Sequence, residues 1–348
     1  ACINANNLSK HPDEDTLNQL FDEHQSSDII PVSQLKQQPL FVEDEHIQKL
    51  FYLRFQNETL AIIGLGNKAN GTVYDPAEEQ LILSMSNLAL LSIQKVSLLQ
   101  QKIEKERMEE ELNLAKSIQK GLLPETMPEW DKYEIFGMNK SSQQVGGDYF
   151  EVREATDGSW GLALADVTGK GFPASLLMSN LQAALHTLMQ SKSDITEATA
   201  RLNDTIYNNT PSDKFITFFW GKFNPDTGVL TYVNAGHNPP FLYRKEDGSI
   251  SELQEGGLLL GAMPSMMPYE SGEVKLQSGD MIVMFTDGLT EVFDAQEEEF
   301  GEERLAQVVK KHVHLPAKEF TEHMVAAVMK FSSGVQYDDI TSLVLKAK

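Results

Sequence analysis

Four segments of the chain place aspartate at the end or the start of an apolar run. Asp148 follows two glycines in VGGDYFEV, Asp166 ends LALAD, and Asp287 ends MIVMFTD. Asp338 and its neighbour Asp339 lead directly into the last apolar run, ITSLVL. A buried carboxylate is costly unless it is paired or binds a metal, and no lysine or arginine stands in fixed partnership with all four segments. The pattern favours a site for Mg²⁺ or Mn²⁺, although each aspartate taken alone also fits an ordinary turn.

Other kinds of catalytic site find no support in the sequence. The GKG turn at 169–171 lacks the glycine that a P-loop requires at the position of Leu164, and no serine or threonine follows its lysine. No GxSxG or HExxH motif occurs, and the single cysteine, Cys2, lies in a polar segment. Catalysis by a serine or cysteine nucleophile is therefore not expected.

The elements around these aspartates predict a mixed α+β domain. Short apolar runs bounded by Gly, Asp and Asn predict strands at FITFFWGKF, GVLTYVNAGH, PPFLYRKEDGSISEL and MIVMFTD, with hairpin turns at NPDTG and KEDGS. Helices are predicted over FPASLLMSNLQAALHTLMQS, SDITEATARLNDTIYNN and FGEERLAQVVKKHV, and DITSLVLKA forms a final strand. Strands and helices do not alternate regularly, which favours a sandwich over a doubly wound sheet.

A smaller unit and a long helix are predicted ahead of this domain. Residues 1 to about 47 are polar, with weak helical patterning around EDTLNQLFDEH, and KLFYLRFQNETLAIIGLGNK predicts a hairpin. Asp75, Pro76 and Glu78 have the spacing of an N-cap, a first-position proline and a capping box. The helix that begins there is expected to end at GLLPETMPEW.

This helix is about 40 residues long, which exceeds the usual length in globular proteins. Its apolar residues follow a heptad spacing, interrupted by Ser92 and by EKER at 104–107. The expected seam is Ala89, Val96, Leu99 and Ile103. Either the helix packs on its own domain or, as we favour, residues 91–122 form a parallel coiled-coil linker of a homodimer. The break in phase is then the point where a sensor twists the linker.

Charge and composition restrict the partners and the compartment. The 348 residues carry a formal net charge of −22, which disfavours nucleic acid and anionic membranes as partners. One cysteine fits a reducing compartment, and the first residues lack the pattern of a signal peptide. The most apolar window, 81–99, contains Asn87, Gln94 and Lys95 and is expected to be too polar to span a membrane. A cytoplasmic protein is expected.

Five motifs occur in one order along the chain: VGGDYFEV, LALADVTGKGFPASLLMS, YVNAGHNPPFLYR, MIVMFTDGLTEVFDAQEEEFGEERL and DDIT. Over residues 115–348 this order resembles the PPM-type metal-dependent serine/threonine phosphatases, in the bacterial branch of sporulation and stress-response (partner-switching) phosphatases. The segment LGNKANGTVYDPAEEQLILSMSNLALLSIQ resembles, more weakly, the closing part of a GAF sensor domain.

The resemblance implies an α-β-β-α sandwich at residues 123–348, a linker at 91–122 and a GAF-like α/β sensor domain at 1–90. It also implies two Mn²⁺ or Mg²⁺ ions at one end of the sandwich. The four aspartates would then be both catalytic residues and metal ligands, with Asp166 bridging the ions and the Val167 carbonyl binding one of them. Asp148 would hold one ion, and Asp287 and Asp338 the other.

Three residues near the motifs have two interpretations each. Glu151 stands where the family usually has aspartate, and either contacts metal-bound water or, as we favour, braces its loop. His237 is either a general acid or a histidine that fixes its turn. Lys170 either touches substrate phosphate or is an exposed turn lysine. We leave His237 and Lys170 outside the catalytic set.

The expected function is that of a protein serine/threonine phosphatase acting on a phosphorylated regulatory protein. By family analogy the substrate is an anti-sigma-factor antagonist, and the N-terminal sensor controls the enzyme. The alternative is a catalytically weak sensor or docking module that acts by ligand-dependent dimerisation.

Overall fold

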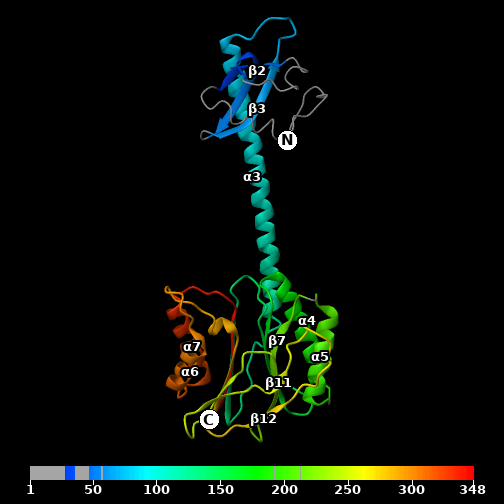
Figure 1. Cartoon of the computed structure of the whole chain (residues 1–348), viewed down its shortest axis with the longest axis vertical. Helices are drawn as coiled ribbons and strands as arrows, with labels where there is room; N and C mark the ends of the chain where they lie inside the picture. Colours follow the sequence, from blue (N-terminus) through cyan, green and yellow to red (C-terminus); the bar gives the residue numbers. More distant parts are fainter. Residues whose placement is uncertain (1–27, 36–46, 56–57, 192, 212) are drawn as a thin grey trace. The chain divides into compact units, whose positions relative to one another are not determined.

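The computed structural model describes residues 28–35, 47–55, 58–191, 193–211 and 213–348 (Figure 1). Cys2 and the segment EDTLNQLFDEH lie outside these residues. The chain divides into two compact units, which meet between Met108 and Glu109. This boundary falls within a single long helix, α3 (Pro76–Lys120).

The first unit contains a three-stranded antiparallel sheet. Its strands are β1 (Ile29–Pro31), β2 (Ile47–Phe55) and β3 (Glu58–Gly66), in the order β1-β2-β3, and a short 3₁₀ turn, η1 (Val32–Gln34), follows β1. The predicted hairpin is therefore confirmed as β2–β3. Alternate residues of β2 face opposite sides of the sheet, so one side packs Phe51 and Leu53 against Leu83 of α3.

The beginning of α3 has the predicted capping box. The Asp75 carboxylate accepts hydrogen bonds from the backbone N–H groups of Ala77 and Glu78, both at 2.9 Å. Glu78 Oε2 in turn accepts from the Asp75 backbone N–H at 2.8 Å, which completes the reciprocal pair. The helix then continues without interruption to Lys120. The sequence EKER at 104–107 therefore changes the phase of the apolar stripe but does not break the helix.

The sequence window 81–99 was expected to be too polar to span a membrane. The length and mean hydropathy of α3 contradict this expectation. α3 is long enough and, over an 18-residue window, apolar enough to cross a membrane. Its leucines and isoleucines outweigh the amide and hydroxyl side chains in the mean hydropathy. Only 6% of that window is buried among the described residues.

The second unit is a sandwich of two sheets. One sheet has the order β10-β9-β13-β14-β4, and the other has the order β11-β8-β7-β6-β5, with β12 paired to β8. Helices cover the outer faces (Figure 1). The strands are β4 (Tyr133–Lys140), β5 (Tyr149–Glu154), β6 (Trp160–Val167), β7 (Ile216–Asn224), β8 (Val229–Ala235), β9 (Phe241–Tyr243), β10 (Ile250–Glu252), β11 (Gly256–Gly257), β12 (Gly272–Lys275), β13 (Met281–Phe285) and β14 (Ile340–Ala347). The helices are α4 (Phe172–Met189), α5 (Ile195–Asn209), α6 (Gly301–His312) and α7 (Ala317–Phe331), with a 3₁₀ turn, η2 (Asp287–Leu289).

Three apolar clusters hold these four layers together. The central cluster fills the space between the sheets and includes Leu164 from one sheet and Leu343 from the other. A second cluster packs α4 and α5 on the β5–β8 sheet around the fully buried Trp220. The third packs α6 and α7 on the opposite sheet around Phe320. The expected α-β-β-α sandwich is therefore the observed architecture of this unit.

Helix α7 was not predicted from the sequence. Its buried positions Ala317, Phe320, Met324 and Val328 are spaced 3, 4 and 4 residues apart, which is the helical period. Pro316 stands at the N-cap and the segment contains no glycine. This signal was available in the sequence.

Candidate metal centre

Strand pairing brings the four predicted aspartates to one end of the sandwich. β5 and β6 are antiparallel, so Asp148, just before β5, lies beside Asp166 near the end of β6. β13 and β14 are also antiparallel, so Asp287, just after β13, lies beside Asp338, just before β14. In neighbouring antiparallel strands, the end of one strand lies beside the start of the next. Because the two sheets pack face to face, the aspartate pair of one sheet lies next to the aspartate pair of the other.

Asp148 is buried, Asp166 and Asp287 are partly buried, and the side chain of Asp338 is 39% exposed. These carboxyl groups are close enough to affect one another's protonation. Burial raises the pKa of Asp148 well above its usual value, and the charge of Asp166 adds to the effect. Burial likewise raises the pKa of Asp166 to about 6 and that of Asp287 to about 7. Negative charges from Asp338 contribute to both of these shifts. The free energy of ionising this cluster is therefore high unless positive charge is supplied.

Glycines let the backbone approach the cluster closely. A Cβ atom on Gly147 would lie 2.8 Å from the carbonyl oxygen of Val167, and one on Gly146 would lie 2.0 Å from a carboxylate oxygen of Asp339. Neither position has room for a side chain. The Val167 carbonyl therefore faces the loop that carries Asp148, as expected for a backbone oxygen of the same site.

Asp339 is a site residue to which the sequence analysis gave no role. Its buried carboxylate accepts hydrogen bonds from the backbone N–H of Gly147 at 2.9 Å and from the backbone N–H of Ser142 at 2.6 Å. It thereby holds the loop before Asp148 against the start of β14. Asp338 has different contacts: its carboxylate pairs with Lys170 at 2.7 Å and accepts from the backbone N–H of Asp339 at 2.8 Å. The double aspartate in DDIT was the available signal.

Thr286 fixes the orientation of Asp148. Its hydroxyl donates to Asp148 Oδ2 at 2.8 Å and its oxygen accepts from the backbone N–H of Thr341 at 3.1 Å. All three residues are buried. The hydroxyl thus connects the two sheets at the point where the aspartates meet.

Lys170 lies against the cluster. Its Nζ is 2.7 Å from Asp338 Oδ2 and donates to the Tyr337 carbonyl at 2.9 Å. The hydrogen bond to Asp338 raises the pKa of Lys170, which keeps the ammonium charged. The side chain of Lys170 is about half-exposed, as predicted for a turn lysine. It is also bound to the site by its ion pair with Asp338.

His237 has the structural role that we favoured. Its Nε2 lies 3.1 Å from the Phe285 carbonyl, its Nδ1 lies 2.8 Å from the Thr217 hydroxyl, and its backbone N–H donates to Asn234. Burial lowers its pKa to about 4, so the ring is neutral at physiological pH. A buried, neutral ring with both nitrogens engaged fixes its turn and is not suited to act as a general acid.

Glu151 braces its strand, also as we favoured. Its carboxylate accepts a hydrogen bond from the Tyr149 hydroxyl at 2.6 Å and contacts His186 of α4. Burial alone would raise the pKa of Glu151, but the hydrogen bonds from His186 and Tyr149 lower it overall. The extra methylene relative to aspartate reaches toward α4, away from the aspartate cluster.

The donor set fits hard divalent cations. Four neighbouring carboxyl groups and a backbone carbonyl are oxygen ligands of the type preferred by Mg²⁺ and Mn²⁺. In the part of the chain that the structure describes, no three histidine, cysteine or acidic side chains stand in the geometry of a formed metal site. The carboxyl groups instead share contacts with one another and with Lys170.

Comparison with known proteins identifies the family. The family model of stage II sporulation protein E (SpoIIE) matches residues 156–348. Phosphoserine phosphatase RsbU of Bacillus subtilis is 31% identical over 244 residues, which cover 70% of this chain and 72% of RsbU. The SiaA-PP2C domain of Pseudomonas aeruginosa has a TM-score of 0.60 at 22% identity, covering 70% of this chain and 98% of that domain. The RsbU and RsbW domains of Rv1364c from Mycobacterium tuberculosis give a TM-score of 0.54 at 25% identity, covering 62% of this chain and 60% of that one. The chain thus belongs to the SpoIIE family of PP2C-type protein serine/threonine phosphatases, in the branch related to RsbU.

Proposed function

We propose that residues 123–348 hydrolyse phosphoserine or phosphothreonine on a regulatory protein, using two Mn²⁺ or Mg²⁺ ions. The ligands would be Asp148, Asp166, Asp287, Asp338 and the Val167 carbonyl. The observation that supports this proposal most directly is the convergence of Asp148, Asp166 and Asp287, whose pKa values are raised by burial and by neighbouring carboxylates. The similarity to RsbU, a phosphoserine phosphatase, supports phosphoserine as the substrate, and the family suggests a phosphorylated anti-sigma-factor antagonist as the substrate class.

The residues of the chain have distinct parts in this proposal. Bound divalent cations lower the pKa of water and neutralise charge on phosphoryl oxygens. Asp339 and Thr286 hold the loop and the carboxylate of Asp148 in position. Lys170 supplies a fixed positive charge at the edge of a strongly negative protein, where a phosphate dianion would approach.

The direct test is hydrolysis of p-nitrophenyl phosphate and of a phosphoserine peptide with Mn²⁺, with Mg²⁺ and with excess chelator. Titration calorimetry with Mn²⁺ should report two ions. Turnover that persists in excess chelator would contradict the proposal. Ligand-dependent dimerisation without turnover would favour the alternative of a docking module, which the intact set of aspartates disfavours.

We further propose that residues 1–90 form a GAF-like sensor domain, that residues 91–122 form the linker, and that α3 carries its signal to the metal centre. The coupling of α3 to the metal centre is supported by a pair of hydrogen bonds at the last turn of this helix. Gln119 Nε2 donates to the Gly146 carbonyl at 2.6 Å, and the Gly146 backbone N–H donates to Gln119 Oε1 at 3.1 Å. Gly146 lies two residues before Asp148, so the position of this helix turn bears on the loop of a proposed metal ligand.

Replacing Gln119 by alanine should weaken Mn²⁺ binding about 10-fold to 100-fold, the range typical of residues that orient metal ligands. The expected result is a higher Mn²⁺ concentration for half-maximal activity, with less change in activity at saturating Mn²⁺. Lys116→Ala, on an exposed face of the same helix segment, serves as the control. Equal Mn²⁺ dependence in the two variants would contradict a role for Gln119.

We also propose that α3 pairs with α3 of a second copy, in a cytoplasmic homodimer. The face of α3 that packs on its own sheet includes Leu83 and Leu90. On the opposite face, large apolar side chains are exposed in a stripe: Leu81, Met85, Leu88, Val96, Leu99 and Ile103. This stripe contains three of the four predicted seam residues and repeats every 11 residues, from Met85 to Val96 and from Leu88 to Leu99. An 11-residue repeat gives a nearly straight pair of helices with slight right-handed supercoiling.

The double variant Val96→Glu/Leu99→Glu should be monomeric, because it places charges opposite their own copies in the seam. Sedimentation equilibrium should show the wild type as a dimer in detergent-free buffer. The variant Gln100→Glu/Gln101→Glu adds the same charge beside the stripe and should stay dimeric. A wild type that is monomeric in buffer and binds lipid vesicles would favour a membrane role for this helix.

A further inference from the structure

Exposed large apolar side chains are concentrated in a few places on the described residues of 109–348. Apart from two on α3, they form two groups. One lies within ten residues along the chain of Asp166, Asp287 or Asp338, and consists of Phe172, Leu176, Phe293, Val335 and Tyr337. The other lies on α5 and between β11 and β12, and consists of Tyr207, Leu258, Met263, Met266 and Met267. Clustered apolar surface on a highly charged protein marks sites of interaction.

Phe293 and Tyr337 form an aromatic pair at the edge of the aspartate cluster. Their rings are perpendicular, with centroids 6.1 Å apart, and remain 39% and 46% exposed. Tyr337 precedes Asp338, and its carbonyl accepts the hydrogen bond from Lys170. A protein segment that brings a phosphoryl group to Asp338 therefore meets this pair.

The loop that carries Phe293 is strongly acidic. Residues 291–300 contain five acidic side chains and no lysine or arginine, and one of the five, Glu298, pairs with Arg304 of α6 at 2.9 Å. The loop is held in one shape, because Asp294 Oδ1 accepts from the backbone N–H groups of Gln296 at 2.8 Å and Glu298 at 2.9 Å. Its end is closed by the Phe300 N–H, which donates to the Val292 carbonyl at 2.7 Å. Negative charge is thus presented in a fixed position next to an apolar pair.

We propose that Phe293, Tyr337 and the acidic loop 291–300 recognise the residues beside the phosphoserine of the substrate. The surface selects an apolar side chain next to the phosphoserine and lysine or arginine further along the same segment. The apolar neighbour covers the aromatic pair, and the basic residues face the acidic loop. Lys170 meanwhile faces the phosphate. This inference rests on the proposed phosphatase function and specifies its substrate class.

A purely structural role for the aromatic pair makes a different prediction. The Phe293–Tyr337 contact joins the segments that carry Asp287 and Asp338, so it can also hold these two segments together; we call this structural role a clasp. Removal of a clasp changes metal affinity and the turnover of every substrate. Removal of a recognition surface changes the ranking of substrates that differ only beside the phosphoserine.

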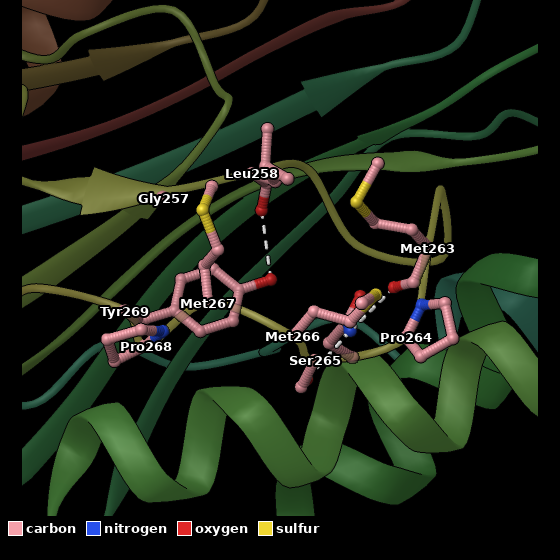
Figure 2. A pocket seen from close by; sticks show the side chains of 10 residues that line it. Gly257, Leu258, Met263, Pro264, Ser265, Met266, Met267, Pro268 and Tyr269 are labelled. Carbon is pink, nitrogen blue, oxygen red and sulfur yellow. Dashed lines mark hydrogen bonds between the residues drawn. The ribbon is translucent and has the colours of Figure 1, made fainter.

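The second apolar group offers a control surface, and Figure 2 shows its members Leu258, Met263, Met266 and Met267. Its loop, 258–269, carries no charged residue and lines a small pocket of about 50 Å³. The loop is anchored at its middle, where Asn203 Nδ2 donates to the Met263 carbonyl at 3.0 Å, and at its ends, where the Tyr269 hydroxyl donates to the Leu258 carbonyl at 2.9 Å. Met266 and Met267 remain exposed. Their removal deletes apolar surface without touching the acidic loop.

The first experiment tests charge selection with two phosphoserine peptides that both place leucine beside the phosphoserine. One continues with lysines and the other with glutamates. For the wild-type full chain at low ionic strength we expect kcat/KM to be about tenfold higher for the lysine peptide, falling toward equality in about 0.5 M salt as screening increases. Glu297→Lys/Glu299→Lys should reduce the preference to about twofold or less.

The charge-matched control is Glu246→Lys/Glu273→Lys. Both residues are exposed, and Glu246 follows the Tyr243–Met281 pair at the start of β13, the opposite end of that strand from Asp287. This control should keep the tenfold preference. A wild type that treats the peptides equally, or a control that loses the preference as fully as the loop variant, overturns the proposal.

The second experiment compares leucine with glycine beside the phosphoserine, with lysines beyond. Burial of a leucine should favour the leucine peptide about fivefold to tenfold in the wild type and in Met266→Ser/Met267→Ser. Phe293→Ser and Tyr337→Ser should each lose most of this ratio, which is taken within one variant and so is independent of its overall turnover. An unchanged ratio with weakened Mn²⁺ binding in calorimetry identifies a clasp and overturns the proposal.

Hydrolysis of p-nitrophenyl phosphate separates failure of this inference from failure of the proposed function. This substrate has no flanking residues, so its Mn²⁺-dependent turnover reports only the phosphatase activity. If the wild type does not hydrolyse it, the proposed function fails. If it does while the peptide preferences are absent, only the recognition surface is refuted.

Discussion

Replacing Asp166 by asparagine should lower kcat/KM for p-nitrophenyl phosphate by about 10³-fold at saturating Mn²⁺ for the wild type. The expected loss reflects several kcal/mol of charge stabilisation, since a tenfold change in rate corresponds to about 1.4 kcal/mol. Asp166 lies at the centre of the cluster, where it contacts Asp148 and is close to the charges of Asp338 and Asp339. Asparagine keeps the size of the side chain but removes the charge that would attract the cations.

The matched control for this variant is Asp226→Asn. Asp226 is exposed in the turn between β7 and β8, at the end of the sheet away from Asp166. It should retain wild-type turnover and bind two Mn²⁺ ions in calorimetry, whereas Asp166→Asn should bind fewer. Wild-type turnover by Asp166→Asn would remove the basis for the proposed metal centre.

Asp287→Asn should stabilise the metal-free protein at neutral and alkaline pH. Burial raises the pKa of Asp287 to about 7, above its unfolded value of about 3.9, so the folded state binds the proton more tightly than the unfolded state. The corresponding contribution to stability is complete below pH ~4 and is lost as the pH rises through ~7. At pH ~8 in chelator, the variant should therefore exceed the wild type by about 1–3 kcal/mol, discounted for partial solvent exposure.

Scanning calorimetry in chelator at pH ~5 and pH ~8 measures this effect. The transition of the phosphatase unit should rise by roughly 2–4 °C per kcal/mol in the variant at pH ~8, and the difference should shrink at pH ~5. Added Mn²⁺ should make the wild type more stable than the variant, because the wild type gains binding free energy that the variant lacks. A variant that is less stable than the wild type at both pH values without metal would contradict mutual repulsion in the cluster.

Local signals in the sequence predicted the elements that depend on local physics. The capping box at Asp75 and Glu78 and the β7–β8 and β9–β10 hairpins all occur where the residues indicate them. The position of each aspartate at a strand end is also local. That the four strand ends meet is a consequence of strand order, which the sequence supplied only through the family resemblance.

Contacts between segments that are distant in the sequence could not be predicted from local patterns. The pairing of Glu151 with His186 joins β5 to α4, and the role of Asp339 depends on a loop almost 200 residues earlier in the chain. Neither the spacing nor the residue type of His186 marks it as the partner of Glu151, and the same holds for the loop that binds Asp339. α7 was missed for a different reason, since its period was present in the sequence but mixed with alanines and polar residues that weaken the contrast between its faces.

The uninterrupted course of α3 has a consequence for how the protein can diverge. Each residue of an α-helix turns it by about 100°, so gaining or losing one residue between Ile103 and Glu111 would reorient Gln119 by that angle relative to the apolar stripe. Gains or losses of 7 or 11 residues nearly restore the original orientation. Relatives that use the same arrangement should therefore differ in the length of this segment by 7 or 11 residues.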